Sequence, residues 1–231
     1  MNNSALNARL LCAAELTRQD ATFADIGTDH AYLPLFLLES GKIKFAYCCD
    51  INEGPLASAR KNAEERGRLS ETEFILTDGA TVLKDKGITD YAICGMGGEL
   101  IADIIDRAPH LKDESVSLIL QPMTKQECVR RMLCEKGFTV IAERYSFDSG
   151  KYYATIAAEY TGSVTELSAE DAELGFDIPH DEDRVEYLGY LEGKKKAVVK
   201  ALNGKIKGGV DLTEDECALK LIEERISKIK G

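Results

Sequence analysis

Phe23-Ala24-Asp25-Ile26-Gly27-Thr28-Asp29-His30-Ala31-Tyr32-Leu33-Pro34 is the stretch that decides the predicted fold. A short apolar run ends in an acid and a glycine, a polar turn follows, and an apolar segment then resumes. A parallel strand passes into a helix in this manner where an α/β sheet binds a ligand. The stretch therefore predicts a strand, a turn and a helix, with Gly27 letting backbone amides approach that ligand.

Apolar runs of strand length alternate with helix-length segments through the first part of the chain. The predicted strands are residues 22–26, 45–49, 73–76, 91–94 and 117–120. The predicted helices are residues 7–16, 32–40, 53–66, 98–107 and 124–136. This alternation predicts an α/β fold, with a doubly wound, mainly parallel, Rossmann-like sheet. Two β-prone runs, 138–147 and 151–160, predict a terminal antiparallel hairpin, which is typical of class I methyltransferases rather than of plain dinucleotide-binding domains.

The pattern changes after residue 160, so residues 1–160 are predicted to form one domain. Residues 161–183 are acidic and irregular, and we interpret them as a linker that docks through Leu174, Phe176 and Ile178. In residues 184–231, apolar side chains recur with a heptad-like spacing on either side of a glycine pair. This spacing predicts a C-terminal antiparallel helical hairpin that resembles a coiled coil.

The composition, 44% hydrophobic and 30% charged, is typical of a globular protein. The sequence shows no signal peptide and no apolar run near the roughly 18 residues of a membrane span, which favours a cytoplasmic protein without membrane contact. The seven cysteines have no paired CxxC spacing, and the three histidines have no metal-ligand spacing. We therefore expect reduced core cysteines and no metal site.

A net charge of −11 argues against nonspecific nucleic-acid binding as the main activity. The charge is unevenly distributed, however, because six lysines and no acid lie between residues 193 and 209. This cluster is the strongest basic feature of the chain, and it includes Lys194, Lys195, Lys196 and Lys200.

Acids stand at the ends of three successive predicted strands, as Asp25, Asp50 and Asp78. The carboxyl ends of parallel strands meet at one edge of a sheet, where the ligand lies. Asp25 would hold a ligand ammonium group or brace the loop, and Asp50, with the adjacent Ile51, would contact a ribose. Asp78 would accept a hydrogen bond from an adenine amino group, and Gly79 would admit the flat ring. The three acids in phase predict a cofactor that contains adenosine.

Asp29 stands where the dinucleotide-binding pattern G-x-G-x-x-G has its second glycine. A carboxylate at this place would repel a diphosphate, whereas S-adenosylmethionine has no phosphate and carries a sulfonium cation. The residue therefore favours S-adenosylmethionine over NAD as the cofactor. The neighbouring His30 is expected to pack against that cofactor.

Glycines also mark the end of the fourth predicted strand, where the sequence reads Gly95-Met96-Gly97-Gly98. They predict an opening lined by backbone, with the first two residues against the cofactor and the last two against a flat target base. Gln121, after the fifth strand, supplies an amide for contact with a base at the same edge of the sheet.

The stretch from Ala24 to Pro34, the glycine motif and Leu120-Gln121-Pro122 together resemble the bacterial tRNA (adenine-22-N1) methyltransferase family, often called TrmK. The resemblance covers essentially the whole chain. It implies a class I methyltransferase fold, S-adenosylmethionine as methyl donor, and methylation of N1 of an adenine in the D-arm region of tRNA. Asp29 would then be catalytic, as a carboxylate that faces the N6 amino group of the target adenine.

The implied partner is tRNA, whose phosphates would meet Arg9 and the four lysines Lys194, Lys195, Lys196 and Lys200. The chain is expected to be a monomer or a weak homodimer. Two alternatives remain open from the residues alone. One is a methyltransferase that acts on a small molecule or a protein, and the other is a noncatalytic cofactor-binding module whose helical hairpin mediates assembly.

Overall fold

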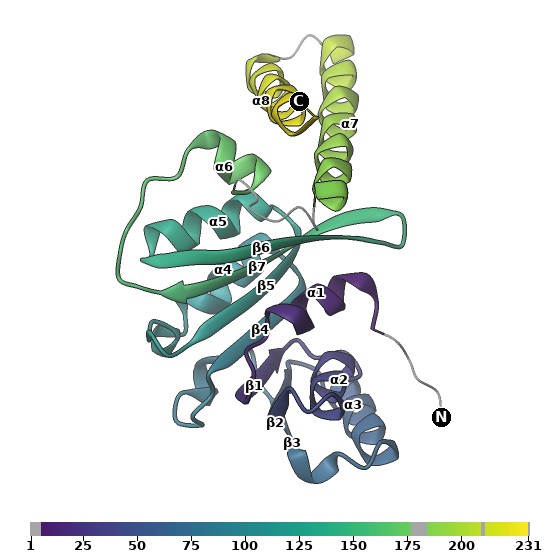
Figure 1. The fold of residues 1–231 in the computed structure, drawn as a ribbon, viewed down its shortest axis with the longest axis vertical. Helices are drawn as coiled ribbons and strands as arrows, with labels where there is room; N and C mark the ends of the chain where they lie inside the picture. Colours follow the sequence, from purple (N-terminus) through teal and green to yellow (C-terminus); the bar gives the residue numbers. More distant parts are fainter. Residues whose placement is uncertain (1–5, 177–183, 209–210, 231) are drawn as a thin grey trace.

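A seven-stranded sheet, in the order β3-β2-β1-β4-β5-β7-β6, forms the centre of the molecule in a computed structural model that describes residues 6–176, 184–208 and 211–230 (Figure 1). The strands are β1 (Ala21–Ile26), β2 (Ile43–Asp50), β3 (Thr72–Leu76), β4 (Asp90–Gly97), β5 (Ser117–Thr124), β6 (Phe138–Asp148) and β7 (Lys151–Tyr160). The first five strands pair in parallel, and β7 pairs antiparallel with both β5 and β6. The predicted Rossmann-like sheet with a terminal antiparallel hairpin is confirmed.

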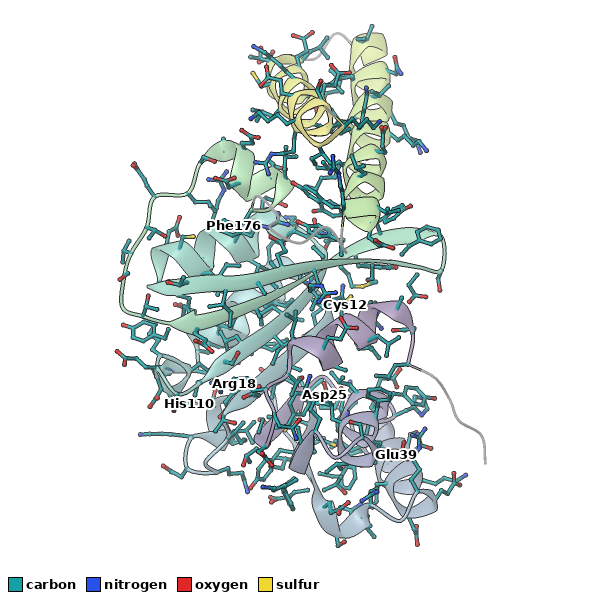
Figure 2. The ribbon with its side chains drawn as sticks, viewed as in Figure 1. Cys12, Arg18, Asp25, Glu39, His110 and Phe176 are labelled. Atoms are coloured by element: carbon teal, nitrogen blue, oxygen red, sulfur yellow. The ribbon has the colours of Figure 1, made fainter. Side chains whose placement is uncertain are left out.

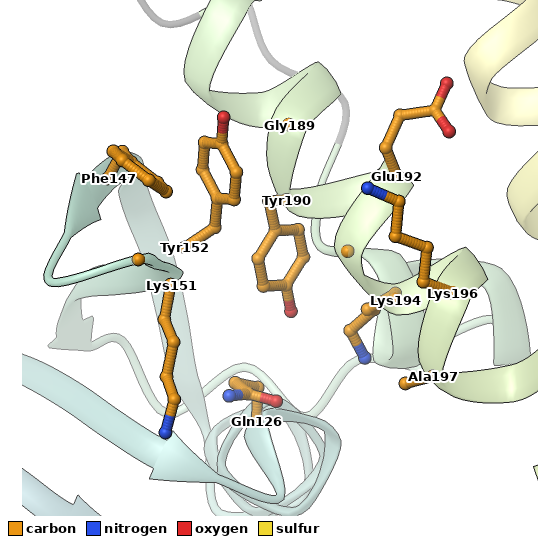
Figure 3. A pocket seen from close by; sticks show the side chains of 12 residues that line it. Gln126, Phe147, Lys151, Tyr152, Gly189, Tyr190, Glu192, Lys194, Lys196 and Ala197 are labelled. Carbon is orange, nitrogen blue, oxygen red and sulfur yellow. The ribbon is translucent and has the colours of Figure 1, made fainter. Parts of the chain in front are cut away.

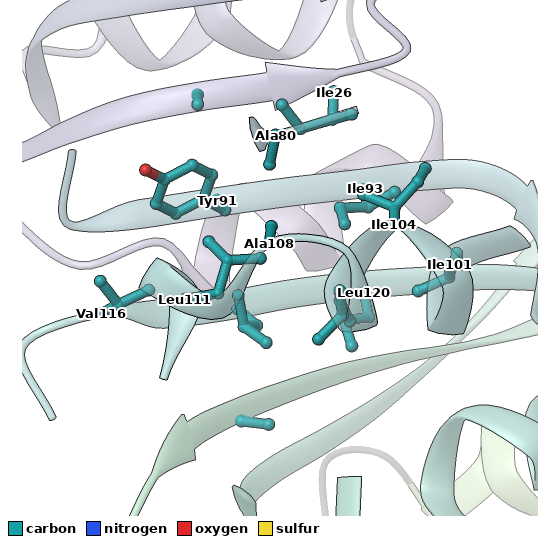
Figure 4. Packing of buried hydrophobic residues seen from close by; sticks show 14 of the residues in the cluster. Ile26, Ala80, Tyr91, Ile93, Ile101, Ile104, Ala108, Leu111, Val116 and Leu120 are labelled. Atoms are coloured by element: carbon teal, nitrogen blue, oxygen red, sulfur yellow. The ribbon is translucent and has the colours of Figure 1, made fainter. Parts of the chain in front are cut away.

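Different helices cover the two faces of this sheet. The helices are α1 (Ala8–Leu16), α2 (Tyr32–Glu39), α3 (Glu53–Glu65), α4 (Gly98–Asp106) and α5 (Gln126–Glu135), and the short 3₁₀ helices are Leu69–Glu71, Thr81–Leu83 and Pro109–Leu111. Side chains alternate between the faces along each strand. On β1, Phe23 packs in the cluster of α1, α2 and α3, whereas Ile26 packs in the cluster of α4 and α5. Figure 4 shows the second cluster, with Ile101 and Ile104 of α4 beside Ile93 of β4.

The strand order reverses between β1 and β4, which lie side by side although β1 is followed along the chain by β2. The chain leaves β1 toward α2 on one face and leaves β4 toward α4 on the other face. Ligands of open α/β sheets bind outside the carboxyl ends of strands at such a point. The edge formed by the ends of β1, β2, β4 and β5 is therefore the candidate site.

The fourth strand is longer than the sequence predicted. Its predicted end was residue 94, but β4 continues to Gly97 and pairs with β5 as far as Thr124. The register shifts between Cys94 and Met96, where Gly95 has a φ of +81°. The glycine motif is therefore the bulged end of a strand. The left-handed conformation of Gly95 interrupts the hydrogen bonds between β4 and β5 at one residue, and the two strands then continue to pair.

The C-terminal helices form the predicted antiparallel hairpin, made of α7 (Arg184–Gly208) and α8 (Thr213–Lys230). Two ion pairs join α7 to α8 and show that the helices run antiparallel. Lys195 pairs with Glu223 at 2.8 Å, and the earlier residue Glu192 pairs with the later residue Lys230 at 3.0 Å. A third apolar cluster, which contains Tyr145 of β6, attaches the hairpin to the β6–β7 end of the sheet. No helix among the described residues is both long and apolar enough to cross a membrane.

Residues 161–176, which begin the segment predicted as a linker, contain a short helix, α6 (Ala169–Leu174). Leu174 is buried and Phe176 is partly buried (Figure 2), whereas Ile178 lies outside the described residues. Two buried arginines from different helices hold α6. Arg130 of α5 donates to the carbonyl of Ala172 at 2.8 Å, and Arg225 of α8 pairs with Glu170 at 2.7 Å.

The ion pair of Arg130 with Glu143 is the most deeply buried contact in this region. The two side chains are 0% and 2% exposed, and Nε and Nη2 of Arg130 donate to the same carboxylate oxygen at 3.2 and 2.5 Å. The other carboxylate oxygen of Glu143 accepts from the amide of Phe176 at 3.3 Å. The pair thus connects α5, β6 and the segment after α6.

Replacing Arg130 with Met should lower the free energy of unfolding by about 3–5 kcal/mol, because it leaves the buried charge of Glu143 uncompensated. Urea unfolding followed by circular dichroism measures this change. Arg131→Met is the matched control, since Arg131 is the exposed neighbour on the same helix and its loss should cost less than about 0.5 kcal/mol. Equal losses in the two variants would contradict the structural role of the buried pair.

Candidate functional site

The turn after β1 is fixed by β2 and packed by β4. The amides of Gly27 and Thr28 both donate to the carbonyl of Cys49, each at 2.8 Å. Gly27 has a φ of +78°, and a Cβ at this position would lie 2.1 Å from Cε of Met96. Glycine therefore allows Met96 to lie directly against the turn, which brings together two residues that the sequence assigned to the cofactor.

Asp25 is buried two residues before this glycine, near the end of β1 (Figure 2). Burial raises the pKa of its carboxyl from the ordinary value of 3.8 to about 6, while Thr28 and the Arg9 guanidinium act in the opposite direction. The Thr28 hydroxyl lies beside the carboxylate but falls short of a well-formed hydrogen bond with any described residue. The end of β1 thus holds a carboxylate that is short of partners and suits a cationic ligand group.

The loop between Gly27 and α2 presents Asp29 to solvent and holds two residues in a left-handed conformation. Nε2 of His30 lies 3.3 Å from a carboxylate oxygen of Asp29, and the His30 ring stacks on Tyr32 at 5.3 Å. His30 and Ala31 have φ angles of 59° and 54°, which non-glycine residues adopt at a cost of roughly 1–2 kcal/mol each. The side chain of Asn62 stabilises this backbone by donating to the His30 carbonyl at 2.9 Å. The loop is therefore a strained and supported structure of the kind found at functional sites.

Asp50 ends β2 at the same edge of the sheet. Its Oδ1 accepts from the amide of Asn52 at 2.7 Å, and its carbonyl accepts from the amide of Thr77 at 2.9 Å. These two bonds fix the loop after β2 and leave the second carboxylate oxygen for a ligand. The adjacent Ile51 is exposed, so it is available as an apolar contact at the rim of the site.

Asp78 and Gly79 follow β3, as predicted, but Asp78 has a partner that the sequence did not indicate. Arg107, which caps the end of α4, donates to both carboxylate oxygens of Asp78 at 3.1 and 3.3 Å. Gly79 is buried with a φ of +89°, and a Cβ there would lie 3.4 Å from Ile104. No motif or periodicity signals Arg107, because the contact joins residues from two elements that only the fold brings together.

Gln121 joins the ends of β4, β5 and α1 through one buried side chain. Its Oε1 accepts from Nη1 of Arg9 at 2.8 Å and from the amide of Gly95 at 3.1 Å. A Cβ on Gly95 would lie 3.5 Å from the same Arg9 nitrogen. The structure therefore brings together three predicted site residues, and the amide oxygen of Gln121 holds the strand ends in place rather than pointing unpaired toward a ligand.

Gly97 and Gly98 lie where β4 passes into α4. A Cβ on Gly98 would lie 2.1 Å from the carbonyl oxygen of Lys125, so this glycine is needed for the packing of α4 against the end of β5. A Cβ on Gly97 would meet Thr124 at an ordinary distance of 3.5 Å. Contact of the two glycines with a target base stays a prediction.

The four predicted lysines lie on α7, next to the β6–β7 hairpin, and two of them already have acidic partners. Lys194 lies 3.5 Å from Glu173, and Lys195 pairs with Glu223 of α8. Lys196 and Lys200 are exposed. The basic cluster is thus partly neutralised by acids of α6 and α8, the helices that precede and follow α7 along the chain.

The cysteines form no disulfide, and the described residues contain no cluster that could hold a metal ion. Four of the seven cysteines are buried, and all seven are unbridged. No group of three or more His, Cys, Asp or Glu residues among the described residues could hold a metal ion.

Replacing Asp25 with Asn should raise the free energy of unfolding of the cofactor-free protein at pH 7.5, by on the order of 3 kcal/mol. The folded pKa of about 6 lies above the unfolded value of 3.8, so ionisation of Asp25 disfavours the folded state. This unfavourable contribution is complete above about pH 6 and disappears as the pH falls below 3.8. Urea unfolding at pH 7.5 and pH 4 tests it, and a gain of the same size at both pH values would contradict it.

Comparison with known proteins places these residues in a described family. Residues 6–156 match the model of a methyltransferase domain. The tRNA (adenine(22)-N(1))-methyltransferase of Bacillus subtilis strain 168 is 35% identical over 159 residues, which cover 69% of this chain and 67% of that relative.

Solved structures are similar over almost the whole chain. A candidate tRNA (m1A22) methyltransferase of Streptococcus pneumoniae, in complex with S-adenosyl-L-methionine, is 30% identical with a TM-score of 0.80, covering 94% of this chain and 98% of that chain. M. capricolum TrmK, in complex with the cofactor product S-adenosyl-homocysteine, is 28% identical with a TM-score of 0.78, covering 97% of this chain and 99% of that chain. Since the similarity in sequence includes the turn after β1 and the similarity in structure includes the helical hairpin, this chain belongs to the tRNA (adenine(22)-N(1))-methyltransferase family, TrmK.

Proposed function

We propose that this protein transfers a methyl group from S-adenosylmethionine to N1 of an adenine in tRNA, at the position 22 that the name of its B. subtilis relative gives. The observation that carries the proposal is the buried Asp25 carboxylate beside the Gly27 turn, at the point where the strand order reverses. A negative charge in this place fits a cofactor that carries an ammonium and a sulfonium group. It does not fit a diphosphate.

The residues at the sheet edge fit S-adenosylmethionine. Asp25 would hold the ammonium group of its methionine part, and the second carboxylate oxygen of Asp50 would accept from the ribose. Asp78 is paired with Arg107, but a carboxylate has about four lone-pair positions, so it keeps acceptor capacity for the adenine amino group. When bound, S-adenosylmethionine supplies an electrophilic methyl group on a positively charged sulfur.

The chain's own part in the reaction is to place the target adenine. Adenine N1 has an in-plane lone pair, so correct orientation and a high effective concentration supply much of the acceleration, and no covalent nucleophile is needed. Methylated adenine becomes neutral again when its N6 amino group loses a proton. The carboxylate of Asp29 accepts a hydrogen bond from N6 and takes up this proton, and His30, at 3.3 Å, orients the carboxylate.

Recognition of tRNA falls to the basic side chains outside the cofactor site. Lys196 and Lys200 are exposed on α7 and contact phosphates, and Arg9 contributes the donors that Gln121 does not occupy. In this division, residues 1–160 bind the cofactor, residues 161–183 connect, and residues 184–231 present the lysines. The protein works in the cytoplasm, where its substrate lies, as a monomer or a weak homodimer.

Replacing Asp29 with Asn should lower kcat for methylation of tRNA by about 100-fold or more, because an amide cannot take up the N6 proton. Calorimetry should find the dissociation constant of S-adenosylmethionine unchanged. Asp20→Asn is the matched control, since Asp20 is exposed like Asp29 but lies at the opposite edge of the sheet, where it pairs with Lys44. Normal turnover of the Asp29 variant would remove this residue from the mechanism.

Replacing Asp50 with Asn should raise the dissociation constant of S-adenosylmethionine by about 10- to 100-fold, because the hydrogen bonds to the ribose lose their charged acceptor. The Asn side chain still accepts from the amide of Asn52, so the loop keeps its shape. Asp113→Asn changes an acid with the same local bond, to the amide of Ser115 at 2.8 Å, and should leave cofactor binding unchanged. Calorimetry on both variants measures the difference. An Asp50 variant with the dissociation constant of the wild type would refute the placement of the ribose.

A further inference from the structure

A cavity of about 710 Å³ lies between the tip of the β6–β7 hairpin and the side of α7 (Figure 3). Its volume is in the usual range of about 300–1,000 Å³ for ligand sites. Because β7 runs antiparallel to β5, the hairpin tip lies toward the carboxyl end of β5, and Gln126 lines the cavity from the start of α5. The cavity is therefore on the same edge of the sheet as the cofactor site, but it is built from different residues.

Aromatic side chains form one wall of this cavity. The rings of Phe147 and Tyr152 lie 4.7 Å apart at the hairpin tip, and Phe147 is 52% exposed. A Cβ on Gly189 of α7 would lie 2.1 Å from Cζ of Tyr152, so this glycine admits the ring against the helix backbone. The wall is thus fixed against α7 while it keeps an apolar surface that faces solvent.

A buried hydroxyl that lacks a hydrogen-bond partner among the described residues borders the cavity. Tyr190 is only 4% exposed, and its hydroxyl forms no hydrogen bond with any described residue. Figure 3 shows this hydroxyl pointing into the cavity on the side of Gln126. Buried polar groups are satisfied in the great majority of cases, and an unsatisfied one costs about 1–3 kcal/mol. The Tyr190 hydroxyl is therefore a polar group that a ligand reaching the base of the cavity could bond.

The charge around the cavity is positive. Lys151 and Lys196 line it and form no ion pair with a described residue, and Lys194 lies 5.6 Å above the Tyr190 ring. Lys194 forms an ion pair with Glu173 at 3.5 Å. Glu192, the one carboxylate among the residues that line the cavity, pairs with Lys230. Lys151 is thus left to meet an anion beside the aromatic wall, and Lys196, whose charge also acts on Glu192, lies across the cavity from it.

We propose that this cavity binds one unpaired nucleotide of the RNA substrate, at a distance along the RNA from the adenine that is methylated. Its base stacks on Phe147 and Tyr152, its phosphate lies between Lys151 and Lys196, and the Tyr190 hydroxyl bonds a polar group of the nucleotide. Aromatic stacking beside cationic side chains is the common way in which proteins hold single-stranded nucleotides. The inference rests on the proposed function and adds a second anchoring point to it.

The first test is Phe147→Ala in the full-length protein, with tRNA as the probe. The dissociation constant of tRNA, measured by filter binding, should rise about fivefold or more, as expected for the loss of a stacking partner, while that of S-adenosylmethionine stays unchanged. Ile141→Ala is the matched control, because Ile141 is 53% exposed on the same strand but does not line the cavity. An unchanged affinity of the Phe147 variant for tRNA would overturn the proposal.

The second test is Tyr190→Phe, which removes only the orphaned hydroxyl. Thermal stability should stay the same or rise, while the dissociation constant of tRNA rises about 2- to 10-fold. Tyr187→Phe is the control, since the Tyr187 hydroxyl accepts from Arg225 at 3.0 Å, and this variant should lose stability and keep its affinity for tRNA. A Tyr190 variant that loses stability and binds tRNA normally would show that the hydroxyl serves the fold, and the assignment of the cavity would be wrong.

Transfer of radiolabelled methyl groups to tRNA separates this inference from the proposed function. A wild-type protein that methylates tRNA, with normal tRNA affinity in both cavity variants, refutes the cavity site and leaves the function standing. If the wild-type protein transfers no methyl group to tRNA, but both cavity variants bind tRNA more weakly than the wild type, the function is refuted and the cavity site is supported.

Discussion

Parallel pairing of β1 with both β2 and β4 is the constraint on which the rest of the structure depends. It places the end of β1 in the middle of the sheet, where the chain departs to opposite faces and leaves the edge open. It also buries Asp25 between Cys48 and Ala92, its register partners, so that the carboxylate is desolvated by backbone and small side chains. The acid at the centre of the site is therefore a consequence of strand register as much as of residue type.

Much of the fold was predictable because it follows from local patterns. The alternation of apolar runs gave the parallel strands, and the change of pattern after residue 137 gave the antiparallel hairpin. Acids and glycines at strand ends were predictable for the same reason, since parallel strands all end at one edge. The boundary of β4 was not predictable, because Gly95 looks like the start of a turn and becomes a bulge only when β5 continues beside it.

The contacts that the sequence did not predict are side-chain contacts between different elements, which only the fold brings together. Arg107 reaches Asp78 from the end of α4, and Lys195 reaches Glu223 from the neighbouring helix. Counted along the chain, the charges of α7 are mostly positive. In the fold, acids of α6 and α8 pair with two of its lysines. The cavity beside Tyr190 was hidden for a related reason, because its walls come from four elements, α5, β6, β7 and α7, and no motif connects them.

The site accepts unfavourable local states that the surrounding structure must offset. Asp25 is charged in a buried place, and His30 and Ala31 hold backbone angles that favour glycine. The packed clusters on both faces of the sheet supply the stability that maintains them. Rigidity around the turn after β1 is thus a requirement for the site, because relaxation of any one of these states would move the carboxylates.

The two arginines that hold α6 also set an order in which the chain can fold during synthesis. Arg130 and Glu143 precede α6, so the sheet and the first of the two contacts can form soon after α6 leaves the ribosome. Arg225 is made much later, and until then Glu170 and Asp171 lack their partner. The helical hairpin therefore docks last, onto a methyltransferase sheet that is already complete.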